Sequence, residues 1–117
     1  MTDGEINTHF SAIENQALVE FLKNLRKKGL SLTHLILFGS KARGDFSPNS
    51  DIDILAITAN PDAKKALYQE VAFILSQFDV YLSIKAFTEQ EFKRLNQFKT
   101  PFTENIKKEG INLWPEL

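Results

Sequence analysis

The sequence reads Gly39-Ser40-Lys41-Ala42-Arg43-Gly44-Asp45-Phe46-Ser47-Pro48-Asn49-Ser50-Asp51-Ile52-Asp53 between two apolar runs. Before this segment, residues 32–38 form a short apolar stretch bounded by glycines, which predicts a buried strand. After it, residues 51–57 predict a second strand, which ends before the breaker Asn60-Pro61. The polar segment is therefore expected to connect two strands of one sheet.

Two carboxylates stand at the start of the second predicted strand. Asp51 and Asp53 are two residues apart, while Ile52 and Ile54 occupy the opposite face. Side chains at this spacing point the same way and lie about 7 Å apart along a strand. Two like charges this close are costly unless a cation neutralises them, and Mg²⁺ prefers hard oxygen ligands together with substrate phosphates. The pair therefore predicts a site for a metal ion and a triphosphate.

The beginning of the segment has the chemistry of a phosphate-binding turn. Gly39 allows the backbone to turn and to approach a ligand closely, because it has no Cβ. Ser40 offers a hydroxyl and an amide at the start of a short predicted helix, which suits an anion. Arg43 has two interpretations, since its guanidinium either pairs with a carboxylate such as Asp45 to steady the loop or contacts the triphosphate. Both remain open, although the loop role is preferred.

The rest of the chain alternates helical and extended patterns. Apolar residues at helical spacing predict amphipathic helices, and a period of two predicts a half-buried third strand. Helices are expected at residues 12–28 and 61–78, from a cap at Thr88 to Leu95, and at 101–109, with strands at 79–87 and 111–114. This order predicts an α/β (α+β) fold, in which helices pack on a small mixed sheet, as a single domain over residues 1–117.

Composition excludes several classes of protein. The chain has 117 residues, a formal net charge of -1 and no cysteine. The near-neutral charge gives no reason to expect direct binding to nucleic acid. No apolar run approaches the roughly 20 residues that span a bilayer, and the first residues lack the pattern of a secretion signal. We therefore expect a cytoplasmic protein without a membrane partner.

The central segment resembles a known signature. A Gly-Ser pair, ten residues and then Asp-x-Asp, with Ala42-Arg43-Gly44 between them, is similar to the motif of the DNA polymerase β-type nucleotidyltransferase superfamily. The resemblance covers residues 18–87 in element order and is sharpest over residues 38–57. Within the superfamily, the short length resembles the minimal nucleotidyltransferases, or MNT proteins. The resemblance implies a polymerase β-type fold, Mg²⁺ as cofactor and ATP or another nucleoside triphosphate as substrate, bound by Gly39, Ser40 and Arg43.

The superfamily commonly supplies a third carboxylate from a neighbouring strand, where it helps to hold the metal and accepts the proton of the attacking hydroxyl. Two residues are candidates for this position. Asp79 stands at the start of the third predicted strand, and we expect it to join Asp51 and Asp53 as a catalytic and metal-binding residue. Alternatively, matching the turn that begins at Thr88 to the superfamily places Ser83 at this position, which would leave the proton acceptor missing or require Asp79 to reach it.

The resemblance also implies a partner. The chain is too short to contain the additional domains that hold the acceptor in larger nucleotidyltransferases. MNT proteins often work beside a small helical HEPN-type protein in toxin–antitoxin pairs, where the MNT member transfers AMP to a tyrosine of its partner. We therefore expect a protein adenylyltransferase that acts as an antitoxin. The alternatives are a catalytically weak nucleotide-binding module that neutralises its partner by binding, and a small-molecule nucleotidyltransferase similar to those that modify aminoglycosides.

Overall fold

A computed structural model describes residues 10–43 and 51–114 of the chain. The described elements are α1 (Ala12–Lys28), β1 (Leu32–Phe38), α2 (Ser40–Arg43), β2 (Ile52–Thr58), α3 (Pro61–Phe78), β3 (Leu82–Thr88), α4 (Glu89–Asn96), α5 (Pro101–Glu109) and β4 (Ile111–Trp114). Every helix and strand expected from the sequence is present, and the bounds of the two long helices agree with the prediction. The α/β fold with a mixed sheet is confirmed.

The four strands form one sheet in the order β3-β2-β1-β4. β1 pairs antiparallel with β2 and with β4, whereas β2 and β3 are parallel. The parallel pair requires a crossover, which α3 supplies between β2 and β3. As a result, the end of β1 and the beginnings of β2 and β3 meet at the same edge of the sheet.

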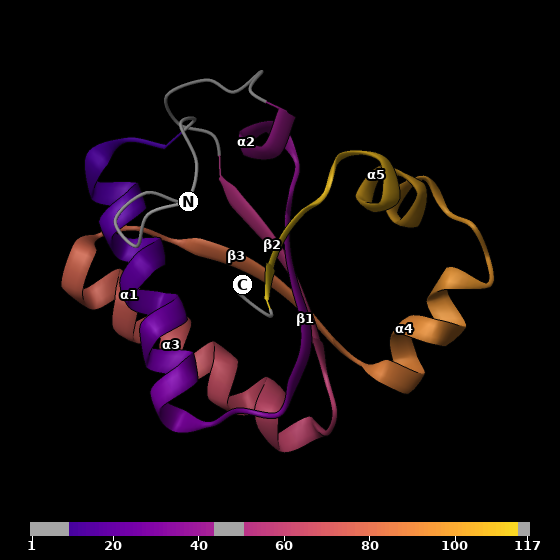
Figure 1. Cartoon of the computed structure of the whole chain (residues 1–117), viewed down its shortest axis with the longest axis horizontal. Coiled ribbons are helices and arrows are strands. Elements are labelled where there is room, and N and C mark those ends of the chain that lie inside the picture. Colours follow the sequence, from indigo (N-terminus) through magenta and orange to yellow (C-terminus); the bar gives the residue numbers. More distant parts are fainter. Residues whose placement is uncertain (1–9, 44–50, 115–117) are drawn as a thin grey trace.

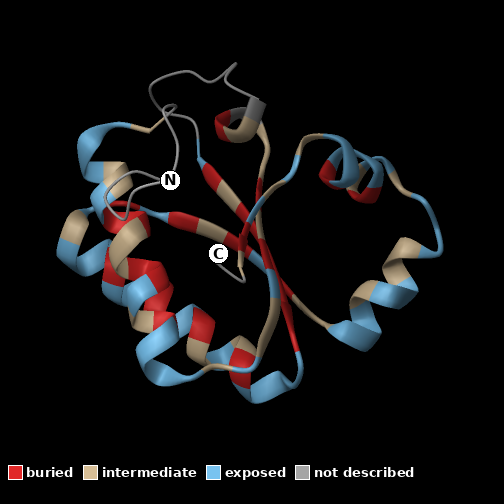
Figure 2. Ribbon diagram, in the orientation of Figure 1, coloured by how far each residue is buried: buried red, intermediate tan, exposed pale blue. Residues whose placement is uncertain are grey.

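Helices cover both faces of the sheet, which gives three layers (Figure 1). On one face, α1 and α3 pack over a core that includes Leu18, Phe21 and Ile54. On the other, α4 and α5 pack over a smaller cluster that contains Leu55, Ile57 and Ile106. Because β2 supplies residues to both clusters, nearly all of it is buried, and Figure 2 shows the buried residues concentrated in the strands and on the inner sides of α1 and α3.

Caps in the sequence determine where the helices begin. Ser11 and Glu14 form a capping box at the start of α1, in which each side chain bonds the other residue's backbone N–H. The side chain of Asn60 accepts a hydrogen bond from the Ala63 N–H at the start of α3, beside Pro61. These contacts satisfy N–H groups that have no partner within a helix. The first residues of α1 and α3 are therefore determined by side chains next to them in the sequence.

A buried carboxylate joins the two long helices. Glu70 of α3 is 2% exposed. Its Oε2 lies 2.7 Å from Lys28 Nζ and its Oε1 accepts a hydrogen bond of 2.6 Å from Asn24 Nδ2, both on α1. Such a charge is tolerated away from water only when it is paired and hydrogen-bonded. Lys28 therefore helps to fix the packing of α1 against α3.

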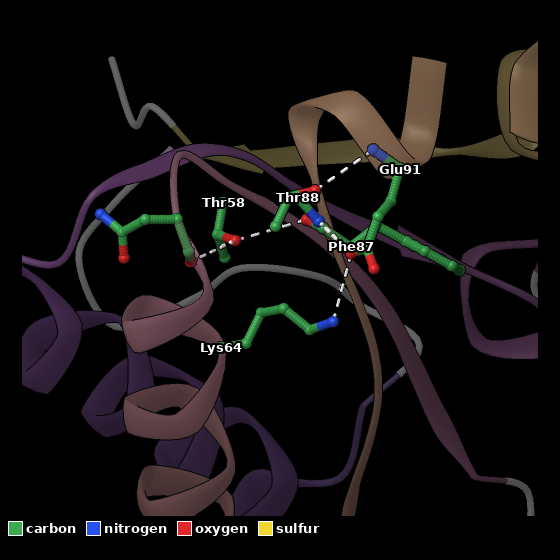
Figure 3. A network of polar contacts seen from close by, with 6 residues as sticks. Thr58, Lys64, Phe87, Thr88 and Glu91 are labelled. Carbon is green, nitrogen blue, oxygen red and sulfur yellow. Dashed lines mark hydrogen bonds and ion pairs between the residues drawn. The ribbon is translucent and has the colours of Figure 1, made fainter. Parts of the chain in front are cut away.

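A second capping box joins α4 to α3 at the end of β3 (Figure 3). The Thr88 N–H donates to Glu91 Oε1 at 2.8 Å, and Lys64 Nζ lies 3.2 Å from the same oxygen. The hydrogen bond from the Thr88 backbone, followed by the one from Lys64, holds the pKa of Glu91 below its ordinary value of 4.5. Both side chains remain partly or well exposed, so the pair contributes little stability by itself.

The third strand begins later than its alternating pattern predicts. Asp79 lies outside β3 and ends α3 in the left-handed conformation, with φ 56°, where its N–H donates to the Leu75 carbonyl. Aspartate is among the few residues other than glycine that adopt this conformation readily. Val80, Leu82, Ile84 and Ala86 are nevertheless all buried, as the period of two predicts. Among the described residues, no helix is long and apolar enough to cross a membrane.

Candidate functional site

The predicted site residues lie around the edge of the sheet where β1 ends and β2 and β3 begin. Phe38, the last residue of β1, is paired with Asp53 of β2. Asp53 is paired on its other side with Ser83 of β3. The described part of the segment that joins β1 to β2 begins with Gly39 and continues as α2, directly above this edge (Figure 1). The topology therefore brings the predicted turn to the start of β2, where Asp53 lies.

Gly39 and Asp53 are in close contact. Gly39 has φ 79°, in the region that favours glycine, and a Cβ at this position would lie 2.5 Å from Oδ2 of Asp53. Real Cβ atoms do not approach other atoms this closely, so a side chain at residue 39 would displace the carboxylate. A glycine at residue 39 therefore suits both the turn and the observed position of the Asp53 carboxylate.

The two predicted metal ligands differ in exposure. Asp53 is half-buried within the ladder, and Asp51, one residue before β2, is exposed. Because side chains alternate along a strand, Asp51 is expected on the same face as Asp53, opposite the buried Ile52 and Ile54. Two carboxylates beside a glycine turn offer hard oxygen ligands, which fits a Mg²⁺ ion bound together with a nucleotide.

The structure does not bring Asp79 together with Asp51 and Asp53. In the described ranges, 10–43 and 51–114, no three acidic or histidine side chains are grouped in a way that could hold a metal ion. Asp79 is exposed and is held in the turn that ends α3. The position level with Asp53 on β3 belongs to Ser83, which is half-buried. Of the two candidates for the third position, Ser83 is the one that is paired with Asp53.

Of the predicted nucleotide-binding residues, only Gly39 is described with its surroundings. Ser40 and Arg43 are the first and last residues of α2, so their backbone is in place, but their side chains lie outside what the structure describes. Residues 44–50, which include Asp45, are likewise outside the described residues. The interpretation of Arg43 as a loop or a phosphate residue therefore remains a prediction.

An aromatic cluster borders the site on the side of α5. The rings of Phe38 and Phe102 meet edge to face, with their centroids 5.5 Å apart. The ring of Phe102 also packs against that of Phe87, with a distance of 6.5 Å between the centroids. Phe38 is the β1 neighbour of Asp53, so the carboxylate stands between an apolar wall and Ser83. An apolar wall beside Asp53 lowers the local dielectric, which strengthens the attraction between this carboxylate and a cation.

The short helix that follows the predicted turn contains a buried lysine that the sequence pattern does not single out. Lys41 of α2 is 2% exposed, and its Nζ lies 3.1 Å from Oε1 of Glu14. The spacing of Ser11 and Glu14 is a recognisable capping-box signal in the sequence. Nothing in the sequence, however, indicates that Glu14 meets a residue 27 positions later.

Comparison with known proteins identifies the family to which the chain belongs. The chain matches the family described as "Nucleotidyltransferase domain" over residues 18–112. A segment of 45 residues is 47% identical to a protein of Methanocaldococcus jannaschii that is provisionally named a protein adenylyltransferase. This segment covers 38% of the chain and 45% of the relative, so the match spans less than half of either protein.

Solved structures share the fold at lower identity. One from the MntA–HpeT toxin–antitoxin pair has a TM-score of 0.55 and 24% identity, over 83% of this chain and 71% of that one. A toxin–antitoxin structure with AMP-PNP has a TM-score of 0.52 and 22% identity, over 86% and 73%. A complex of a tri-AMPylated Shewanella oneidensis HEPN toxin with its MNT antitoxin has a TM-score of 0.50 and 18% identity, over 88% and 73%. At these identities the likeness concerns the fold.

Proposed function

Because the chain belongs to the nucleotidyltransferase domain family, we propose that it transfers AMP from ATP to a hydroxyl group of a partner protein. The observation that carries this proposal is the contact between Gly39 and Asp53, which places the predicted phosphate-binding turn against one of the predicted metal ligands. The segment shared with a provisionally named protein adenylyltransferase supports the choice of reaction. The toxin–antitoxin structures with the same fold support the choice of acceptor.

The reaction is a displacement at the α-phosphorus. The acceptor oxygen forms a bond to this phosphorus, the bond to the bridging oxygen of the β-phosphate breaks, and pyrophosphate leaves. Asp51 and Asp53 would hold Mg²⁺, which when bound offsets the charge of the triphosphate. The backbone of Gly39 and Ser40 orients the phosphates, and Arg43 contacts them or steadies the loop. The proton of the acceptor hydroxyl must go to a base or to water.

The position beside Asp53 on β3 is unsuited to accept that proton. We place the superfamily's third position at Ser83, because the pairing of β2 with β3 sets this residue level with Asp53. A serine hydroxyl is a much weaker base than a carboxylate at neutral pH. Asp79, which the sequence favoured, is held in the turn before β3. The chain is therefore expected to transfer AMP slowly unless the acceptor or the partner supplies a base.

Three variants test the assignment of the third position. Ser83→Asp is expected to raise the transfer rate about 100-fold, the usual lower range for adding a positioned general base. Ser83→Ala and Asp79→Asn are expected to change it little, since neither original side chain accepts the proton. Transfer rates at saturating ATP, with nucleotide affinity measured separately, distinguish catalysis from binding. A large loss of rate in Asp79→Asn alone would return the third position to Asp79.

The partner is expected to be a small helical HEPN-type protein, for which this chain is the antitoxin. Proximity and orientation supply much of the catalysis in group transfer, so a docked protein that presents its hydroxyl to the α-phosphate is expected to raise the transfer rate strongly. Incubating the chain with its cognate HEPN-type protein, ATP and Mg²⁺ is expected to add one or more AMP units to that protein. Intact mass spectrometry detects each addition as a mass step.

The control for this experiment is the double variant Ser40→Ala with Asp53→Asn, in which the steps are expected to vanish. A wild-type protein that binds and neutralises the toxin, yet gives no mass step under any nucleotide or Mg²⁺ condition, would contradict transfer. That result would identify the chain as a binding module instead.

A further inference from the structure

Lys41 is a charged residue of the short helix α2 whose side chain is almost completely buried. Its side chain is 3% exposed, although lysine is among the residues least often buried completely. The cost of removing an ammonium group from water is met only when a partner is held at short distance. Glu14 is such a partner, with its Oε1 3.1 Å from Lys41 Nζ. The ion pair is therefore a fixed contact between α1 and α2.

The element that carries Lys41 needs such a contact. α2 has only four residues, and a helix this short does not hold itself together in water. Its two central side chains anchor it: Ala42 packs against the larger core, and Lys41 reaches Glu14. Gly39 and Ser40 directly precede Lys41 in the chain. A shift of the Lys41 side chain would therefore also move the predicted phosphate-binding turn.

The other end of the contact is rigid. Oε1 of Glu14 also accepts the Ser11 N–H at 2.9 Å, so one oxygen serves both the N-cap of α1 and the lysine. α1 is fixed in turn by Ala17 and Leu18, which are fully buried in the larger core. The position of the Glu14 carboxylate is therefore set by the start of α1.

We infer that the Glu14–Lys41 ion pair positions the Gly39-Ser40 turn over Asp53, so that Lys41 is a positioning residue for nucleotide binding. This inference rests on the proposed function, in which that turn binds the triphosphate. Lys41 acts through its ion pair with Glu14. Loss of either partner of the pair should therefore have the same effect on the affinity for Mg²⁺-ATP.

The chain offers a matched control at the opposite edge of the sheet. Glu91 likewise uses one oxygen for a capping box and for a lysine, Lys64, from another helix (Figure 3). This pair differs in two respects: it is far more exposed, with side chains 29% and 49% accessible, and it lies at the end of β3 away from Asp53. The same substitutions there alter the same chemistry without touching α2.

The test compares five single variants and one double variant by calorimetry with Mg²⁺-ATP. Glu14→Gln keeps the capping box, because glutamine serves at this position, and removes the charge. Lys41→Met keeps the apolar stem. Each is expected to bind Mg²⁺-ATP about tenfold more weakly, as for the loss of one charge-assisted contact, with KM raised more than kcat is lowered. Glu91→Gln and Lys64→Met are expected to bind as the wild type does.

The double variant Glu14→Gln with Lys41→Met is expected to be no worse than the weaker single variant, since both remove one interaction. Lys41→Arg is expected to bind nearly as the wild type, because it keeps the charge. Should Lys41→Met fail to fold, Glu14→Gln decides the question alone.

Several results would overturn the inference. Normal binding by Glu14→Gln, with weak binding by Lys41→Met, would mean that Lys41 acts on the nucleotide directly. Lower thermal stability with unchanged Mg²⁺-ATP affinity in both variants would mean that the pair is only structural. A wild-type protein that does not bind Mg²⁺-ATP would refute the proposed function itself, which distinguishes that failure from the other two.

Discussion

Asp53→Asn is expected to lower AMP transfer by about 100-fold or more while leaving the fold intact. The substitution removes one charge from the predicted metal site and keeps the volume of the side chain nearly unchanged. Asp51→Asn is expected to behave similarly, because both carboxylates would hold the same ion. Transfer rate and the affinity for Mg²⁺-ATP are measured for each variant, and circular dichroism checks the fold.

Asp62→Asn is the matched control for this pair. Asp62 is an exposed aspartate in the first turn of α3, at the opposite edge of the sheet from Asp51. It is expected to leave transfer unchanged. Unaltered Mg²⁺-ATP affinity in both Asp51→Asn and Asp53→Asn would refute the two-carboxylate site.

Gly39→Ala is expected to abolish measurable nucleotide binding. The new Cβ would lie 2.5 Å from Oδ2 of Asp53, so either the carboxylate or the turn must move, and each belongs to the site. The φ of 79° adds backbone strain of about 1 kcal/mol for any residue with a Cβ. Nucleotide affinity by calorimetry and the free energy of unfolding in urea measure the two effects separately.

Gly29→Ala is the control that separates the effect of backbone strain from that of the contact between the new Cβ and Asp53. Gly29 caps α1 with φ 61°, and a Cβ there would have no atom within 4 Å. This variant is expected to lose a similar amount of stability to backbone strain and to keep its nucleotide affinity. Equal affinity in Gly39→Ala and Gly29→Ala would show that the contact with Asp53 does not matter for binding.

Much of the fold could be predicted because its signals are local. The apolar spacing of α1 and α3 and the glycine and proline at their ends determine their bounds within the sequence itself. The edge strand at Ile111–Trp114 was likewise predictable, from a stop at Gly110 and a short apolar pattern. The Gly39-to-Asp53 segment was recognisable for the same reason, since all its residues are close together in the chain.

The residue of β3 that lies level with Asp53 could not be determined from the sequence, because it depends on the pairing of two strands. Asp79 continues the alternating pattern of β3 in the sequence, but the end of α3 requires a residue with positive φ, and Asp79 takes that role. Which residue of β3 then lies level with Asp53 is set by the crossover through α3. In the observed register of β2 and β3, Ser83 lies level with Asp53.

Long-range ion pairs were unpredictable for a related reason. Lys41 stands in a polar segment and Glu70 on a helix with many polar residues, so nothing nearby marks either as buried. Their partners Glu14 and Lys28 lie 27 and 42 residues away along the chain. Only the packing of α1 against α2 and α3 brings these groups together.

The central claim, transfer of a nucleoside monophosphate to a protein, is tested most directly by following ATP labelled at either the α- or the γ-phosphate. The wild-type chain is incubated with Mg²⁺ and its cognate HEPN-type protein, and label on that protein is measured together with released pyrophosphate. The account predicts label from the α-phosphate only, with one pyrophosphate released per AMP transferred. Label from the γ-phosphate, or tight neutralising binding without label from either, would contradict it.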